Sequence, residues 1–197
     1  MMFSSTYCAA MLPRVITTVD QRYLRGPSQW SGDSCLVTTV DMGSLAHAVT
    51  TEHPRLAGQL LSLLPGLRDF ELPMRHGAFL AEVMGRIALE LQAIAGARCR
   101  TRCPLTIHGR NGCVRIIIEA QDQKLAAQAL NLAASLLLDL CNGKTVSIRA
   151  RLKGLARGAR TLQPFPVWRG AARAPSAASA VPLELLHAHP APGAVAA

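Results

Sequence analysis

The sequence predicts an α+β fold in which a small antiparallel sheet packs against two main helices, followed by a disordered Ala/Pro-rich C-terminal tail. Three observations support this prediction: two runs of β-branched residues near the start, an Asn-Gly turn signal in the middle, and two long stretches with helical apolar patterning. The 197 residues suit one domain plus a tail, and a hydrophobic content of 50% is sufficient for a packed core.

The first two strands are expected at residues 14–25 and 35–40, where β-branched residues are frequent. Gly26-Pro27 and Ser31-Gly32-Asp33 lie between these runs. Both groups are typical of turns, so the two strands should be joined by a loop.

Helices are expected at residues 44–49, 54–64 and 77–95, with Pro65-Gly66 ending the second of them. The helix at 77–95 has the clearest pattern, because its apolar residues recur at spacings of three and four and form one stripe. The members of the stripe are Leu80, Val83, Met84, Ile87, Leu91 and Ile94.

A hairpin should follow, because Asn111-Gly112 provides the two residues that a type I′ turn requires at positive φ. Its strands are expected at 105–110 and 113–119. The next helix, 122–140, is apolar almost all round, which indicates a place in the centre of the core. Asn142-Gly143 should close it.

A basic amphipathic segment at 147–157 is expected to form a last helix. Of the 37 residues from Thr161 onward, eleven are Ala and six are Pro, and no periodic pattern is present. Such a segment buries too little apolar surface to offset its ordering entropy, which predicts disorder. We therefore expect a flexible N-terminus at 1–13, one domain at 14–160 and a low-complexity tail at 161–197.

The chain is basic, with a formal net charge of +9. Six Lys/Arg and one Glu lie from Arg151 onward, which gives that segment +5 and leaves +4 for the first 150 residues. A basic balance favours an anionic partner such as nucleic acid, a membrane surface or an acidic polymer, without choosing among them.

Six cysteines are present, but the start of the chain has no charged and apolar secretory signal. Reduced thiols and a cytoplasmic location are therefore expected. The most apolar stretch, 125–140, contains Gln128, Asn131 and Asp139 and is too short and too polar to span a bilayer, so no membrane partner is expected.

Four segments resemble one family in the same order. Residues 23–31 (YLRGPSQWS) and 63–67 (LLPGL) resemble its "LRGPN-x-W-S" and "LLP-x-L" segments. Residues 87–92 (IALELQ) and 116–122 (IIIEAQD) are similar to its "VALELQ" and "VVIEY-x-D" segments. The family is that of the cyanophycin synthetases, and the resemblance is to their N-terminal domain.

The resemblance implies a role with cyanophycin, a poly-aspartate chain that carries arginine on each side-chain carboxylate. An ATP-grasp module and a Mur-ligase-like module of the full-length family add Asp and Arg, using ATP and magnesium, while the N-terminal domain holds the polymer. This chain stops before both modules. We therefore expect a non-catalytic cyanophycin-binding domain or a truncated fragment of the synthetase, with no cofactor of its own.

The expected partners are cyanophycin or short Asp-Arg chains, together with ligase modules or further copies of the chain. Cys141 to Thr145 ends like a phosphate-binding loop, but Leu138 stands where that loop requires its first glycine. For this chain alone we do not expect ligase activity.

Many members of the family carry H-x-x-E-H ahead of "VALELQ", a spacing that places two zinc ligands and a general base on one helix face. The corresponding residues here are Glu82, Gly85 and Arg86. The ligand set is missing, so a degenerate zinc-hydrolase-like domain is kept only as an alternative.

A second set of residues has side chains that can bind a metal. Cys99, Cys103, His108 and Cys113 could supply four ligands, but their spacing is unusual for zinc and strand cysteines are usually small core residues. No metal site is expected.

A cyanophycin-binding face should combine arginines for the polymer's carboxylates with acidic residues for its guanidinium groups. Arginines cluster around the hairpin, and one more lies in the first loop. The candidate polymer-binding residues are Arg25, Glu90, Arg98, Arg100, Arg102, Arg110 and Glu119. A solvated charged surface without a ligand is the alternative explanation of the same residues.

The alternative from another class is a basic module that binds nucleic acid or another polyanion. The charge favours it, but the chain has only two Tyr, four Phe and two Trp as stacking platforms and no nucleic-acid-binding motif. Much of the excess charge also lies after residue 150, so the sequence argues against nucleic acid as the main partner.

Overall fold

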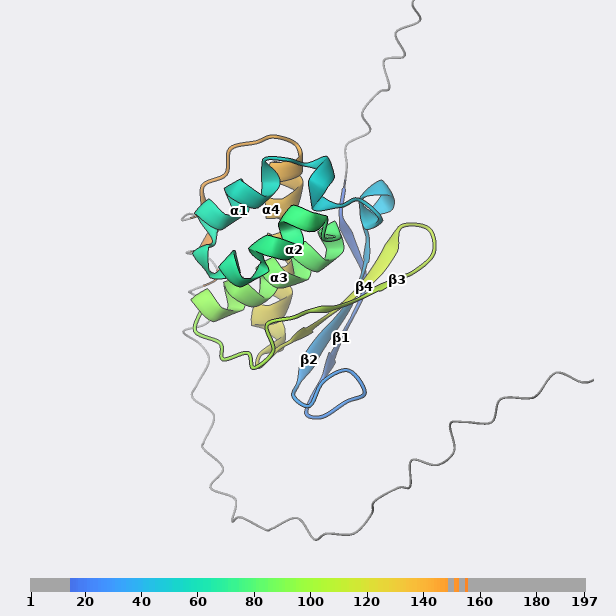
Figure 1. Cartoon of the computed structure of the whole chain (residues 1–197). Helices are drawn as coiled ribbons and strands as arrows, with labels where there is room; N and C mark the ends of the chain where they lie inside the picture. Colours follow the sequence, from blue (N-terminus) through green and yellow to red (C-terminus); the bar gives the residue numbers. More distant parts are fainter. Residues whose placement is uncertain (1–14, 149–150, 153–154, 156–197) are drawn as a thin grey trace, which may run out of the picture. The chain divides into compact units, whose positions relative to one another are not determined.

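The computed structural model of the protein describes residues 15–148, 151–152 and 155. This part of the chain forms a four-stranded antiparallel sheet, and its helices gather on one side of that sheet (Figure 1). The predicted α+β class is confirmed. The residues predicted to form a flexible N-terminus (1–13) and a disordered tail (161–197) lie outside the described residues.

The strand order is β1-β2-β4-β3. The strands are β1 (Thr17–Leu24), β2 (Cys35–Asp41), β3 (Leu105–His108) and β4 (Cys113–Glu119). The turn between β3 and β4 has the predicted geometry, with φ of 58° at Asn111 and 76° at Gly112. Strand β3 is shorter than predicted because the chain already turns after His108, where the Gly109 amide donates to the carbonyl of Cys113.

The two faces of the sheet differ in burial, as alternating side chains require. The side chains of β2 and β4 that face the helices are buried: Leu36, Thr38, Val40, Val114, Ile116 and Ile118. On the opposite face Val37 and Thr39 are half-buried and Arg115 is exposed. Toward the other end of the same face Cys35, Ile117 and Glu119 are buried, but they do not belong to this core. The sheet therefore contributes one face to the core.

Two long helices supply the other side of the core. Helix α3 (Leu80–Ile94) buries the predicted stripe, although Ile94 at its end is 47% exposed. Helix α4 (Gln123–Cys141) begins after Asp122, whose carboxylate accepts a hydrogen bond from the Leu125 amide at 2.6 Å. Length and composition alone would let α4 cross a membrane, but eight of its residues are buried in the core, as in a core helix.

The smaller elements depart from the prediction. The segment at 44–49 forms only a 3₁₀ turn, η1 (Gly43–Ala46), followed by a second one, η2 (Thr50–Glu52). Helix α1 (Leu56–Leu63) lies where a helix was predicted. No element was predicted between Pro65 and Gly77, where the structure has η3 (Pro65–Phe70) and α2 (Glu71–His76).

These two elements escaped prediction because they are too short to show a period. Pro73 also lies inside α2, but it occupies the first turn, where its missing amide hydrogen has no intrahelical acceptor. In the predicted last helix (147–157), Ser147 is not helical. The other described residues of this segment, Ile148, Arg151, Leu152 and Leu155, are helical.

Gly85 allows α3 to approach the sheet closely. A Cβ atom at this position would lie 2.6 Å from Cβ of Pro104 and 3.2 Å from a methyl group of Ile116. Pro104 precedes β3 directly and Ile116 is buried in β4, so neither neighbour can move freely. Helix α3 therefore tolerates no side chain here.

Gly85→Ala is expected to lower the free energy of unfolding by about 1–3 kcal/mol, because overpacking outweighs the better helix propensity of alanine. Urea denaturation measures this change. Gly58→Ala in α1 is the matched control: no atom lies within 4 Å of a Cβ there, so the substitution should stabilise the protein by about 0.5–1 kcal/mol. Equal effects at the two glycines would contradict the packing argument.

Candidate functional site

A surface segment at residues 97–104, the arginine loop, connects α3 to β3 and carries three of the predicted arginines. The carboxylate of Glu119, at the end of β4, holds this loop in place. It accepts hydrogen bonds from the amides of Arg100 at 2.8 Å and Thr101 at 2.6 Å, and from the Thr101 hydroxyl at 3.0 Å. Glu119 is only 6% exposed, and both of its oxygens are engaged.

Gln121 fixes the start of the same loop. It accepts from the Arg98 amide at 3.2 Å and donates to the Arg98 carbonyl at 2.6 Å. Gln92 of α3 donates to the carbonyl of Glu119 at 3.2 Å, so the helix, β4 and the loop are joined. Glu119 and Gln121 thus fix the backbone that presents the exposed side chains of Arg98, Arg100 and Arg102.

Two of these arginines lie beside carboxylates from other elements. A guanidinium nitrogen of Arg100 lies 3.6 Å from Asp33, in the loop between β1 and β2. One of Arg102 lies 3.5 Å from Asp69, in η3. The arginine side chains are 84% and 74% exposed, so both ion pairs are weak in water.

Asp69 also holds a buried arginine. The guanidinium of Arg86, in α3, donates to both oxygens of Asp69 and to the carbonyl of Arg102, and it lies 6.0 Å from the centre of the Phe70 ring. Burial raises the pKa of Asp69, but hydrogen bonds and charge from Arg86 and Arg102 outweigh this effect and leave the pKa below its usual value. Asp69 is therefore a carboxylate that links α3, η3 and the arginine loop.

This arrangement bears on the zinc-hydrolase alternative. In the register that the family resemblance gives, Arg86 stands at the second histidine and Gly85 at the general base. Arg86 is a cation that forms an ion pair with the carboxylate of Asp69. The packing around Gly85 leaves no room for a catalytic side chain. The geometry therefore provides neither a zinc ligand nor a base at these two positions.

The structure brings several of the predicted residues to one end of the sheet. Arg25 directly follows β1, whose last residue Leu24 pairs with Cys35, and Cys35 in turn pairs with Glu119. Arg25 thus lies at the same end as the arginine loop. Glu90 lies in α3 one turn after Arg86.

Arg110 is separated from this group. It lies in the turn before Cys113, where β4 begins, whereas Glu119 ends that strand. Six residue steps along a strand correspond to about 20 Å. The sequence cluster around the hairpin therefore divides into an arginine loop at one end and an isolated Arg110 at the other.

Three charged residues that contact the arginine loop were not among the predicted site residues: Asp33, Asp69 and Arg86. Asp33 and Asp69 are single carboxylates in a loop and in a 3₁₀ helix, so no spacing pattern marked them. Arg86 was considered only as a missing zinc ligand. The one available signal was indirect: a cluster of arginines predicts that carboxylates lie nearby to balance its charge.

The cysteines and the histidine that were weighed as metal ligands do not converge. Cys99 contacts the carbonyl of Glu119 at one end of β4, and Cys113 lies at the other end. Burial, together with the charge of Glu119, raises the pKa of Cys99 to about 11, which keeps its thiol protonated. Among the residues that the structure describes, no group of three His, Cys, Asp or Glu side chains could hold a metal ion.

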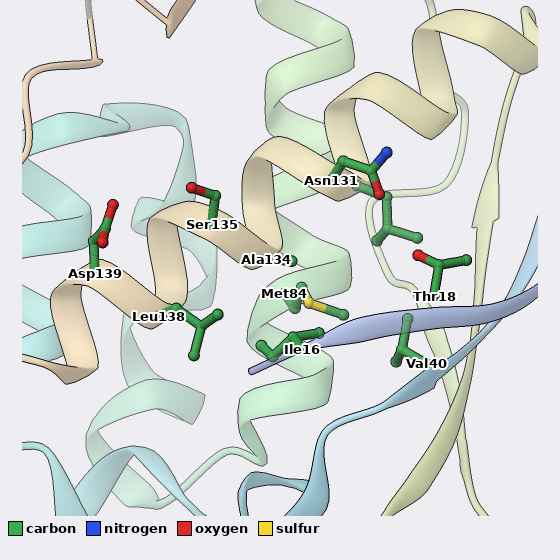
Figure 2. Close-up of a pocket in the computed structure, with 10 residues that line it drawn as sticks. Ile16, Thr18, Val40, Met84, Asn131, Ala134, Ser135, Leu138 and Asp139 are labelled. Atoms are coloured by element: carbon green, nitrogen blue, oxygen red, sulfur yellow. The ribbon is translucent and has the colours of Figure 1, made fainter. Parts of the chain in front are cut away.

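A hollow of about 320 Å³ lies between the start of β1 and α4 (Figure 2). Ile16, Val40 and Met84 give it an apolar wall, and Thr18, Asn131 and Ser135 supply hydroxyl and amide groups. Thr18 pairs with Val40, and Val40 with Val114, at the end of the sheet away from Glu119. The hollow and the arginine loop are therefore separate features.

Asp139 lies at the rim of this hollow. Its carboxylate accepts hydrogen bonds from Arg151 at 2.6 Å and Lys144 at 3.1 Å, and these two bonds lower its pKa. Lys144 follows Gly143, whose φ of 72° ends α4. The segment that ends like a phosphate-binding loop is thus a helix C-terminus whose lysine pairs with the helix itself.

The fold and the site define a small α+β domain whose distinctive chemistry is a buried glutamate that presents arginines on a surface loop. The chain matches the family model of the cyanophycin synthase-like N-terminal domain over residues 37–142, more than half of its 197 residues. It therefore belongs to this family. The match runs from β2 to the end of α4 and includes the arginine loop, but not the segment at 23–31. No curated protein matches the chain.

Proposed function

We propose that this domain binds cyanophycin, or short Asp-Arg chains, without turning it over. The observation that carries the proposal is the anchoring of the arginine loop by Glu119, which leaves Arg98, Arg100 and Arg102 exposed on a fixed backbone. A preorganised loop binds with a smaller loss of conformational entropy than a mobile one. The proposal holds equally for a domain that acts alone, that joins ligase modules or that derives from a longer synthetase.

The mixture of charges supports this ligand. Each unit of cyanophycin carries one carboxylate and one guanidinium, and the site pairs Arg100 with Asp33 and Arg102 with Asp69. Both ion pairs are long and solvent-exposed, so replacing them with contacts to the polymer costs little free energy. Its carboxylates would then contact the arginines, and its guanidinium groups the aspartates.

Binding of nucleic acid or another polyanion is the rival proposal, favoured only by the net charge of +9. Asp33 and Asp69 stand against it, because carboxylates among the arginines repel phosphate groups. A polyanion should also lose affinity steeply with salt. If nucleic-acid binding is present and disappears on deletion of residues 151–197, it belongs to the basic C-terminal segment and not to the arginine loop.

Co-sedimentation with insoluble cyanophycin at low salt tests the proposed function. We expect the wild-type chain in the pellet. Arg100→Ala combined with Arg102→Ala should weaken binding about tenfold or more, equivalent to about 1.4 kcal/mol. Arg110→Ala combined with Arg115→Ala also removes two exposed arginines, but away from the loop. This double variant is the matched control and should bind like wild type. A wild-type chain that stays in the supernatant would refute the proposal.

The second part of the proposal, binding without turnover, has its own test. Adding zinc to the chain with cyanophycin should give no shortening of the polymer, because Gly85 and Arg86 supply no base or ligand in the zinc-type register. Chain length is followed by gel electrophoresis of the polymer. Zinc-dependent shortening would overturn our interpretation of these residues.

A further inference from the structure

Glu90 is a half-buried carboxylate without a partner. It lies in α3, and no hydrogen bond or ion pair to it is present within the described part of the chain. The other acidic side chains around the arginine loop, Glu119, Asp69 and Asp33, all have donors. A carboxylate that is partly removed from water and unpaired is unfavourable unless something else supplies its donors.

The position of Glu90 is set by a glycine. Its carboxylate lies directly over Gly66 in η3, and a Cβ atom at Gly66 would overlap both carboxylate oxygens. The missing side chain of Gly66 therefore forms the space that the carboxylate fills. The oxygens are held against the backbone of η3 and do not extend freely into solvent.

Helix α3 and η3 contact each other at two places. We call this contact the α3–η3 seam. At one point Arg86 binds Asp69, and at the other Glu90 covers Gly66. Arg86 and Glu90 are four residues apart in α3, about 6 Å along the helix axis. Arg102, which shares Asp69 with Arg86, places an exposed guanidinium beside the first point. The seam thus holds both an unpaired carboxylate and an exposed cation.

We infer that Glu90 is the subsite for the guanidinium of one arginine of the bound polymer, whose carboxylate is taken by Arg102. This inference rests on the proposed function. It adds which group of the polymer each side chain contacts, and it predicts a preference for arginine over lysine in the polymer. The two oxygens of a carboxylate match the planar donor pair of a guanidinium, which a lysine ammonium lacks. Asp69 already binds the guanidinium groups of Arg86 and Arg102 at the same seam.

The test compares soluble oligomers of β-Asp-Arg and of β-Asp-Lys with the same length and the same charge. Isothermal titration should show that the wild-type domain binds the arginine oligomer about tenfold more tightly, equivalent to about 1.4 kcal/mol. Glu90→Gln keeps the shape of the side chain but removes its charge. It should reduce the preference to about twofold or less, mainly by weakening the arginine oligomer.

Two further variants separate a subsite from a general effect of charge. Glu82→Gln makes the same change two helical turns earlier in α3 and should keep the wild-type preference. Gly66→Ala keeps the charge of Glu90 but displaces its carboxylate, so the preference should fall as well. Because the displaced atoms end a flexible side chain, this variant should stay folded, which a thermal melt checks.

The outcomes are distinguishable. If the wild-type domain binds neither oligomer, the proposed function itself fails. If it binds both with equal affinity, or if Glu90→Gln keeps the preference for arginine, polymer binding stands and the assignment of Glu90 is wrong. Loss of preference in Glu90→Gln and Gly66→Ala, but not in Glu82→Gln, supports the subsite.

Discussion

Glu119→Ala is expected to lower the free energy of unfolding by about 2–4 kcal/mol, because it removes a buried carboxylate that accepts three hydrogen bonds from the arginine loop. The carboxylate accepts from two amides and one hydroxyl of the arginine loop and is only 6% exposed. Urea denaturation measures the loss. Cyanophycin binding should also weaken about tenfold or more even where the variant is still folded, because the arginines lose their fixed backbone.

Glu119→Gln is the informative companion. One of its two terminal groups becomes a donor, which faces a backbone amide that also donates, so part of the loss should remain. Glu52→Ala, at an exposed glutamate of η2, is the control for removing one negative charge and should change stability by less than about 0.5 kcal/mol. Should Glu119→Ala be as stable as Glu52→Ala, the loop is not anchored as the structure describes.

The elements predicted well are those whose signal is local and repeated. The stripe of α3, the Asn111-Gly112 turn and strand β4 each satisfy a pattern that neighbouring residues define by themselves. The elements η3 and α2 have no such pattern, because six residues contain fewer than two helical turns. Their formation depends on burial of Leu67, Phe70 and Met74 against the rest of the core.

The candidate site could be predicted only in part for a related reason. Composition identified the arginines, but pairing of Arg102 with Asp69 depends on η3, which was not predicted. The sequence also could not show that Arg110 lies about six residue steps along β4 from the loop, at the other end of the strand. Glu119 was predicted to bind the polymer because it is acidic. In the structure its carboxylate instead accepts hydrogen bonds from the backbone of the arginine loop.

The ion pair between Arg86 and Asp69 is expected to be the second large contribution to stability. Arg86 has a side chain that is 6% exposed, so Asp69→Ala leaves a buried cation without its counter-charge. Removal of one partner of a fully buried pair costs about 3–5 kcal/mol, but Asp69 is 44% exposed, so we expect about 1–3 kcal/mol. Asp33→Ala, which removes the partner of exposed Arg100, is the matched control and should cost less than about 0.5 kcal/mol.

The same pair should make stability depend on acid pH. Because the pKa of Asp69 is lower in the folded protein than in the unfolded chain, its contribution is fully present above its unfolded pKa, about 4. The contribution is lost as pH falls through the lowered pKa, since the folded state must then bind a proton that the unfolded state already holds. The difference in unfolding free energy between wild type and Asp69→Ala should therefore be constant from pH 7 to pH 5 and shrink below about pH 4.

A double-mutant cycle separates the ion pair from packing. Arg86→Met fills a similar volume without charge, and combined with Asp69→Ala it should cost less than the sum of the two single changes, by about 1–2 kcal/mol. This follows because the buried guanidinium is unfavourable only while it lacks its carboxylate. Strict additivity at pH 7, or a difference between wild type and Asp69→Ala that is as large at pH 3 as at pH 7, would mean that Asp69 acts through packing alone.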